Sequence, residues 1–149
     1  MTEIIETPLG RVAVDAADGL VKEIHLGSRG TTAPPRTSVA RDLARYFSGG
    51  DVDFNDYDVD LSEYTEFERR VYDATRAIPA GEVRTYGEIA RAIGKPGASR
   101  AVGNALGRNP ACIVIPCHRV VAANGGLGGF TGGLRWKRAL LRLEGSRPE

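Results

Sequence analysis

Two short helical patterns joined by a glycine-containing turn, between residues 85 and 109, constrain the fold of this chain most strongly. The first opens with Thr85-Tyr86-Gly87-Glu88, which has the spacing of a capping box, and its apolar residues continue to residue 93. Gly94-Lys95-Pro96-Gly97 then predicts a turn, and a second helix extends from residue 98 or 99 to about residue 107, before Asn109-Pro110. This order is typical of a helix-turn-helix, although many helical hairpins bind no DNA.

The second helix of this pair consists largely of small residues, which allow close approach to another surface. They are Ala98, Ser99, Ala101, Gly103 and Ala105. Arg108 lies in the last turn, where a cation suits the negative end of the helix dipole whatever the function. Arg100 lies in the first turn, where the dipole does not favour a cation, so we expect this side chain to act outside the helix.

Residues 1–60 predict a lobe of different character. Residues 1–26 contain short strand-like runs, in which Pro8-Leu9-Gly10 predicts a turn and Asp18-Gly19 predicts a hairpin. Residues 38–47 carry an apolar stripe at helical spacing, and the acidic residues 51–62 are expected to form a linker. A helix should then extend through residues 65–78, because Thr65 and Glu68 have capping-box spacing. We therefore predict an α/β (α+β) fold with a small N-terminal lobe over 1–60 and a mostly helical C-terminal lobe over 64–149.

Charge is divided unevenly between these lobes, although the net charge is only +1. Residues 1–60 carry 11 acidic and 6 basic side chains, whereas residues 61–149 carry 8 acidic and 14 basic ones. The acidic residues within 83–147 are Glu88 and Glu144, among 11 basic residues. Such a distribution is expected of a protein that presents one face to a polyanion, but it also fits an unevenly charged, solvated surface.

The composition excludes several classes of protein. Two cysteines and two histidines are too few for a disulfide scaffold and leave a structural zinc site implausible, so we expect no metal and no cofactor. The acidic N-terminus does not resemble a secretory signal, and the longest compact apolar stretch, residues 111–115, is too short to span a bilayer. We expect a cytoplasmic protein without a membrane partner.

Cys117 is the best candidate for a nucleophile, because thiols gain reactivity near cations and bases, and His118 and Arg119 follow directly. Alternatively, Cys117 is a small buried apolar residue, as we expect for Cys112. If residues 117 and 118 lay on a strand, their side chains would point to opposite faces, so contact needs a turn or a bridging water. A thiolate could attack a carbonyl, as in hydrolases, or a saturated carbon, which would give a stable thioether. Composition leaves both reactions open.

The segments around Cys117 have distinct patterns. Residues 111–115 predict a buried strand, and residues 124–133 read NGGLGGFTGG, a glycine loop that lets another group approach the backbone closely. A final amphipathic helix follows. Its expected core residues are Leu134, Trp136, Leu140, Leu141 and Leu143, and its expected outward residues are Arg135, Lys137, Arg138 and Arg142.

The run Ile115-Pro116-Cys117-His118-Arg119-Val120 resembles the active-site signature of the 6-O-alkylguanine-DNA alkyltransferases. The resemblance extends over residues 64–145. It includes Arg100-Ala101-Val102-Gly103, Asn109-Pro110, the glycines from 128 to 133, and residues 141–145. It implies a ribonuclease-H-like N-terminal lobe and a winged-helix-like helix-turn-helix. It also implies single-turnover transfer of an alkyl group from O6 of guanine in double-stranded DNA, with base flipping from the minor groove. We expect a monomer, and the resemblance leaves cooperative binding on DNA open.

The resemblance also implies roles for individual residues. Cys117 matches the alkyl acceptor, His118 the base that reaches the thiol through a water, and Glu144 the carboxylate that orients this histidine. Asn109 matches the residue that links the helix-turn-helix to the active-site segment. Tyr86 matches the tyrosine that helps to protonate the departing guanine and crowds the DNA backbone.

Two further sets of residues match DNA contacts and the base pocket. Arg100 matches the arginine that fills the gap left by the flipped base. The expected DNA contacts are Arg100, Tyr86, Ala98, Ser99, Ala101, Gly103, Arg108 and Arg119. The expected pocket residues are Val120, Gly128, Phe130, Thr131 and Lys137. Phe130 and Thr131 depart from the family's usual tyrosine and serine, so any hydrogen bond through the tyrosine hydroxyl is lost here.

Two alternatives to alkyl transfer belong to different functional classes. The chain could be a non-catalytic DNA lesion-binding or regulatory helix-turn-helix protein, as are the relatives that carry tryptophan at the cysteine position. It could also be a cysteine hydrolase, which would need an oxyanion hole for which the sequence shows no separate motif. Cys117 argues against the first alternative.

Overall fold

The computed structural model describes residues 2–17, 19–124, 126–130 and 133–146, which divide into two compact units. The first unit comprises residues up to 60 together with 110–114, and the second comprises 61–109 and the residues from 115 onward. The sequence assigned 110–114 to the C-terminal lobe. The structure places this segment in the first unit because the Ile24 amide donates to the Pro110 carbonyl and Ile24 forms a parallel bridge with Ala111.

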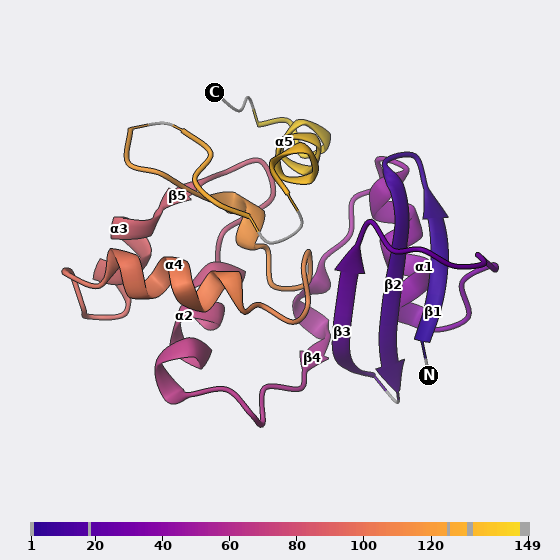
Figure 1. The fold of residues 1–149 in the computed structure, drawn as a ribbon, viewed down its shortest axis with the longest axis horizontal. Coiled ribbons are helices and arrows are strands. Elements are labelled where there is room, and N and C mark those ends of the chain that lie inside the picture. Colours follow the sequence, from indigo (N-terminus) through magenta and orange to yellow (C-terminus); the bar gives the residue numbers. More distant parts are fainter. Residues whose placement is uncertain (1, 18, 125, 131–132, 147–149) are drawn as a thin grey trace. The chain divides into compact units, whose positions relative to one another are not determined.

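The first unit is a four-stranded sheet with one helix (Figure 1). Strands β1 (Thr2–Thr7), β2 (Gly10–Ala17) and β3 (Leu20–Leu26) form an antiparallel meander, and the short β4 (Asp58–Val59) pairs parallel to β3. The predicted hairpin and the predicted earlier turn are confirmed by the pairing of the strands on either side of each. Asp18 itself lies outside the described residues.

Helix α1 (Ser38–Phe47) packs against this sheet through the apolar stripe that the sequence predicted. Its N-cap is Thr37, whose hydroxyl accepts from the Ala40 amide. The core of the unit consists of buried residues from both layers: Ile5, Val12, Val14, Val21, Ile24, Val39, Leu43 and Phe47. The predicted acidic linker contains a 3-10 turn, Phe54–Asp56, before β4.

The second unit contains the predicted helix pair. Helix α2 (Glu66–Arg76) precedes it, strand β5 (Arg84–Thr85) leads into α3 (Tyr86–Ala92), and α4 (Ser99–Gly107) follows the turn. Both predicted capping boxes are confirmed, Thr65 with Glu68 and Thr85 with Glu88, and each satisfies backbone donors at a helix start. Helices α3 and α4 pack together and against α2 (Figure 1). The mixed α/β fold predicted from the sequence is therefore correct.

The apolar run at 111–115 is not the regular strand that the sequence predicted. Ala111, Cys112 and Ile115 form isolated bridges only, and the chain turns at Ile113, whose φ of 79° lies in the left-handed region. A β-branched residue rarely adopts this conformation, which costs about 1–2 kcal/mol relative to the right-handed region. Ile113 is 2% exposed, so burial of its side chain holds the strained turn in place.

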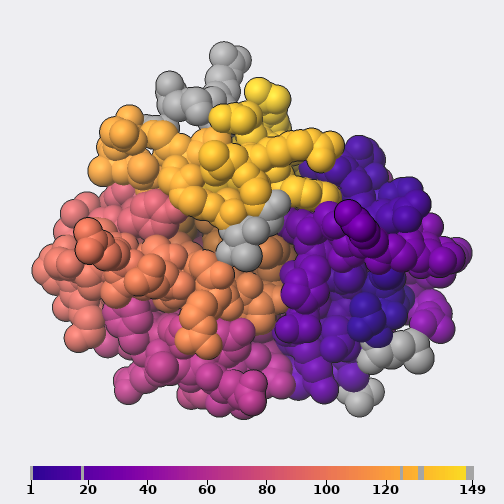
Figure 2. Space-filling view, in the orientation of Figure 1, coloured from indigo at the N-terminus to yellow at the C-terminus, as the bar shows by residue number. Residues whose placement is uncertain are grey.

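Helix α5 (Leu134–Leu143) closes the second unit (Figure 1). Arg135, Arg138 and Arg142 are exposed, as predicted, and Figure 2 shows the C-terminal helix in yellow. Two predictions for this helix are wrong: Leu134 is 45% exposed, whereas Lys137 is completely buried. Among the residues that the structure describes, no helix has the length and apolar character of a membrane span.

Candidate active site

Cys117 begins a single 3-10 turn, Cys117–Arg119, which leads into the short strand β6 (Val120–Val121). Pro116 precedes the turn with ψ of 63°, and the Arg119 amide donates to its carbonyl. Strand β6 pairs parallel with β5, immediately before α3, so the turn is fixed beside the helix pair. Because these residues form a turn and not a strand, Cys117 and His118 are not forced to opposite faces of a sheet.

Cys117 lines a cavity of about 530 Å³, which is large enough for a small organic ligand. Only 6% of the residue is exposed, and this exposed part faces the cavity. The cavity is lined by Tyr86 of α3, by Ser99, Arg100, Gly103, Leu106 and Gly107 of α4, and by Cys117, Gly129 and Phe130. A candidate nucleophile and the helix expected to contact DNA therefore share one recess.

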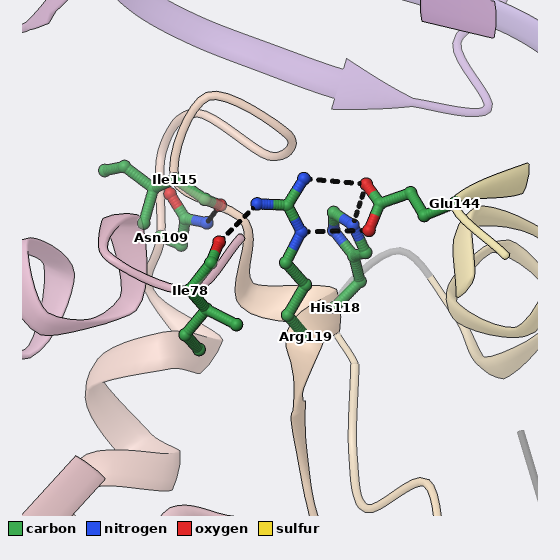
Figure 3. Close-up of polar contacts among 6 residues, drawn as sticks. All are labelled: Ile78, Asn109, Ile115, His118, Arg119 and Glu144. Atoms are coloured by element: carbon green, nitrogen blue, oxygen red, sulfur yellow. Dashed lines mark hydrogen bonds and ion pairs between the residues drawn. The ribbon is translucent and has the colours of Figure 1, made fainter. Parts of the chain in front are cut away.

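His118 is completely buried and bonds to a buried carboxylate. Its Nε2 lies 2.8 Å from Oε2 of Glu144, whose side chain is 2% exposed (Figure 3). A carboxylate only accepts hydrogen bonds, so the neutral ring carries its proton on Nε2. Nδ1 has no hydrogen-bond partner among the described residues. The tautomer therefore leaves Nδ1 as the ring nitrogen that can accept a proton.

Burial lowers the pKa of His118 below its ordinary value, while the bond to Glu144 raises it and the positive charges of Arg119 and Lys137 lower it again. The lowering influences dominate, so the imidazole is neutral at neutral pH. A neutral imidazole is the form that can act as a base toward a thiol.

Asn109, just after α4, connects this helix to the nucleophile's segment. Its Nδ2 donates to the Ile115 carbonyl at 2.8 Å (Figure 3), and the same carbonyl accepts from the Cys117 amide at 2.8 Å. The Ile115 carbonyl oxygen therefore links Asn109, at the end of the helix pair, to the backbone of Cys117. This contact has the placement that the resemblance implied for Asn109.

Tyr86, the first residue of α3, is half-buried on the cavity wall, and burial raises its pKa. Its hydroxyl donates to the Gly129 carbonyl at 3.4 Å. Gly128 has a φ of 71°, and a Cβ atom there would lie 2.6 Å from the Tyr86 hydroxyl. A glycine is therefore needed at 128 both for the backbone conformation and for the close approach of the tyrosine.

Lys137 does not line the cavity; it binds the loop that does. Its Nζ donates to the carbonyls of Val120 (2.7 Å), Leu127 and Gly129 (3.1 Å). It also lies about 6 Å from the ring centres of Tyr86 (5.9 Å) and Phe130 (6.0 Å). Burial lowers the pKa of Lys137 to about 8.

The remaining predicted DNA contacts differ in their exposure and in their partners within the protein. Ser99, Arg100 and Ala101 are exposed on α4, Gly103 is half-buried, and Ala98 is the N-cap of α4. Arg108 is exposed but pairs with the buried Glu68 at 2.7 Å and lies over the Tyr64 ring. Thr131, expected in the base pocket, lies outside the described residues.

Arg119, which was expected among the DNA contacts, is bound within the protein. Its side chain is 12% exposed and bonds to protein groups on every side. Nε donates to Oε1 of Glu144 and Nη2 to Oε2, both at 2.9 Å, and Nη1 donates to the Ile78 carbonyl at 2.6 Å (Figure 3). Sequence reasoning missed this ion pair, because 25 residues separate the partners.

Within the described ranges, no group of three or more histidine, cysteine or carboxylate side chains is placed to hold a metal ion. The cavity is therefore lined by a thiol, a phenol and an arginine, and the neutral imidazole that follows the thiol in the chain is buried with its carboxylate. This arrangement can deprotonate the thiol and present it to a ligand in the recess.

Comparison with known proteins agrees with this site. The sequence profile of the 6-O-methylguanine DNA methyltransferase DNA binding domain matches residues 66–146. The methylated-DNA–protein-cysteine methyltransferase of Methanosarcina acetivorans is 42% identical, and the match covers 96% of this chain and 97% of the relative.

Solved structures show the same relationship. The crystal structure of Mycobacterium tuberculosis OGT in complex with DNA matches with a TM-score of 0.83 and 40% identity, over 97% of this chain and 92% of the other. The O6-methylguanine-DNA methyltransferase of Pyrococcus kodakaraensis matches with a TM-score of 0.78 and 27% identity, over 97% and 99%. The profile and the full-length relatives together show that this chain belongs to the methylated-DNA–protein-cysteine methyltransferase family.

Proposed function

We propose that this chain repairs DNA in a single turnover, by transferring a methyl or larger alkyl group from O6 of guanine in double-stranded DNA to its own Cys117. The observation that carries the proposal is the cavity that Cys117 shares with Ser99 and Arg100 of α4. The family is named for methyl transfer from DNA to a protein cysteine, and the M. tuberculosis relative was solved with DNA. A nucleophile and a DNA-binding helix on one recess suit a base that enters from the duplex.

The reaction begins with the thiol. Cys117 loses its proton to Nδ1 of His118, through an intervening water, and Glu144 stabilises the imidazolium that forms. The thiolate attacks the alkyl carbon, the carbon–O6 bond breaks, and its electron pair remains on the guanine. Tyr86, after releasing the Gly129 carbonyl, donates a hydrogen bond to the departing base, which takes up one proton from solvent, while the His118 imidazolium returns the thiol proton to water. The product is a thioether, which water does not cleave, so each molecule acts once.

Base flipping follows from where the cavity lies. A guanine stacked in a duplex cannot reach a side chain that is 6% exposed, so the nucleotide must rotate out of the helix, at a cost of a few kcal/mol. Arg100 is exposed on the rim, and its long planar side chain can fill the gap in the stack. The small residues of α4 suit close approach to the minor groove. The proposal also takes the protein to act on DNA as a monomer.

Transfer of a labelled methyl group tests the function. The protein is incubated with excess duplex DNA that contains O6-methylguanine with a labelled methyl, and label bound to protein is counted. We expect at most one label per molecule, with no further transfer after repeated additions of DNA. Sustained turnover beyond this stoichiometry would contradict the proposal, as would DNA binding without any transfer, which is the behaviour of a lesion-binding protein.

The two cysteines provide a matched control. Both are buried, at 6% for Cys117 and 7% for Cys112, but Cys112 belongs to the other unit and is absent from the cavity lining. Cys117→Ser should abolish transfer while the protein still binds DNA. Cys112→Ser should transfer one label as the unchanged protein does.

A further inference from the structure

Glu144 occupies an unfavourable position for a carboxylate. It is the C-cap residue of α5, at the negative end of the helix dipole, and its side chain is 2% exposed. A buried, ionised carboxylate at this position needs compensation from a cation and hydrogen-bond donors. A neutral His118 offers one donor and no charge, which leaves the negative charge unbalanced.

Arg119 supplies both the charge and the donors. Two of its nitrogens bind the two oxygens of Glu144, and a third binds the Ile78 carbonyl beyond the end of α2. This is the two-pronged geometry in which a planar guanidinium fixes the plane of a carboxylate, which a lysine cannot reproduce. The bond to Ile78 fixes the guanidinium in turn (Figure 3).

We propose that Arg119 is a positioning residue for alkyl transfer: it holds and neutralises Glu144, so that Glu144 orients His118 without converting the resting imidazole into an imidazolium. The proposal rests on the proposed function, because it gives His118 the task of accepting the Cys117 proton. Without Arg119, the Glu144 charge would be balanced instead by a proton on His118. The ring would then have no free lone pair when the thiol must be deprotonated.

The groups that act on His118 support this reading of the geometry. They are Arg119 of the 3-10 turn, Lys137 of α5 and Glu144, the C-cap residue of α5. Burial and the charges of Arg119 and Lys137 lower the His118 pKa, and Glu144 raises it. Removal of Arg119 therefore removes one lowering influence and leaves Glu144 free to raise the pKa.

The direct test is an NMR titration of the two histidines. His25 has a side chain that is 63% exposed and serves as an internal reference, and His25→Gln assigns the signals. In Arg119→Met we expect the His118 pKa to rise by about one unit or more. Arg119→Lys, which keeps the charge, should show a smaller rise. Unchanged titration of His118 in Arg119→Met would overturn the proposal.

The Arg108–Glu68 pair provides a matched control for loss of an ion pair. Glu68 is also a buried carboxylate held by an arginine, at 2.7 Å, but it lies outside the cluster around His118. Arg108→Met should leave the His118 titration unchanged. If Arg119→Met fails to fold, Arg119→Gln carries the test, because its amide can still donate to the carboxylate but has no charge.

The rate of alkyl transfer gives a second readout. The free base O6-benzylguanine is used as substrate, so that DNA binding does not enter. The acid limb of the rate–pH profile should move to higher pH in Arg119→Met, so the fold-loss in rate is larger at pH 6 than at pH 8. A merely structural role predicts the same loss at both. Absence of transfer by the unchanged protein would refute the proposed function, whereas the NMR titration tests Arg119 independently of any transfer.

Discussion

Replacing Lys137 by methionine keeps a long unbranched side chain but removes the ammonium group, which donates hydrogen bonds to three carbonyls. Val120 and Leu127 are buried at 0% and 6% exposure, so their carbonyls would lose a partner away from solvent. Gly129 is exposed, and water can satisfy its carbonyl. The loop from Leu127 to Gly129, one side of the cavity, would lose its bonds to α5.

The cost and the gain of this replacement nearly balance. Burial lowers the Lys137 pKa from 10.5 to about 8, which means that holding the ammonium in the fold costs roughly 3 kcal/mol at neutral pH. Methionine removes this cost. Two buried carbonyls without partners cost about 1–3 kcal/mol each. We therefore expect the free energy of unfolding at pH 7 to change by no more than about 3 kcal/mol.

The pH dependence is the sharper test. Between the folded pKa of about 8 and the unfolded value of 10.5, the unfolded chain binds the Lys137 proton and the folded protein does not. The free energy of unfolding of the unchanged protein should therefore gain roughly 2–3 kcal/mol between pH 7.5 and pH 10, relative to Lys137→Met. Other groups that titrate in this range cancel in the difference.

Urea unfolding followed by tryptophan fluorescence measures this difference, because Trp136, the single tryptophan, is buried beside Lys137 in α5. Lys95→Met, at an exposed lysine, is the matched control. Its free energy of unfolding should change with pH as that of the unchanged protein does. Parallel curves for Lys137→Met as well would refute the reasoning, because they would mean that Lys137 titrates alike in the folded and unfolded states.

Three further substitutions separate the roles proposed for the site. Arg100→Ala should slow repair of duplex DNA at least tenfold more than reaction with free O6-benzylguanine, since only the duplex requires flipping; equal losses in the two rate assays would exclude a gap-filling role. Glu144→Gln should slow alkyl transfer while the dissociation constant for DNA, measured by fluorescence anisotropy, stays within about twofold; a large loss of affinity would indicate a structural role instead. Gly128→Ala should displace Tyr86, lower the free energy of unfolding by about 1–2 kcal/mol through backbone strain, and slow transfer; unchanged stability and rate would show that the loop adjusts without loss.

The local structure of the helix pair could be predicted because its signals are local. The Thr85 and Glu88 side chains bond to backbone groups within one helical turn, so their spacing alone indicates where α3 begins. The second helix was predicted to start at 98 or 99 and end near 107, and it spans Ser99–Gly107. Between the helices, Gly94 has a φ of 78°, which glycine adopts without strain, and Pro96 restricts its own φ, so the turn also has a local signal.

The prediction for Lys137 is wrong because the partners of this side chain are distant in the sequence. Helical spacing placed Lys137 on the outward face of α5, but carbonyls from two other segments bind its ammonium inside the protein. Arg119 was expected among the DNA contacts; its ion pair with Glu144, 25 residues along the chain, is a contact that the sequence pattern did not indicate. The apolar run at 111–115 fits a strand or a buried turn equally well, and the left-handed conformation of Ile113 has no signal in the sequence.

Mapping of the reacted protein tests the central claim most directly. After incubation with duplex DNA that contains one O6-methylguanine, the protein is digested and each cysteine peptide is weighed by mass spectrometry. The Cys117 peptide should be heavier by one CH2 unit in every molecule that has reacted, the Cys112 peptide should be unchanged, and the repaired strand should contain guanine. Loss of the methyl group from DNA with an unmodified Cys117 peptide, or a methyl group on any other residue, would contradict the account.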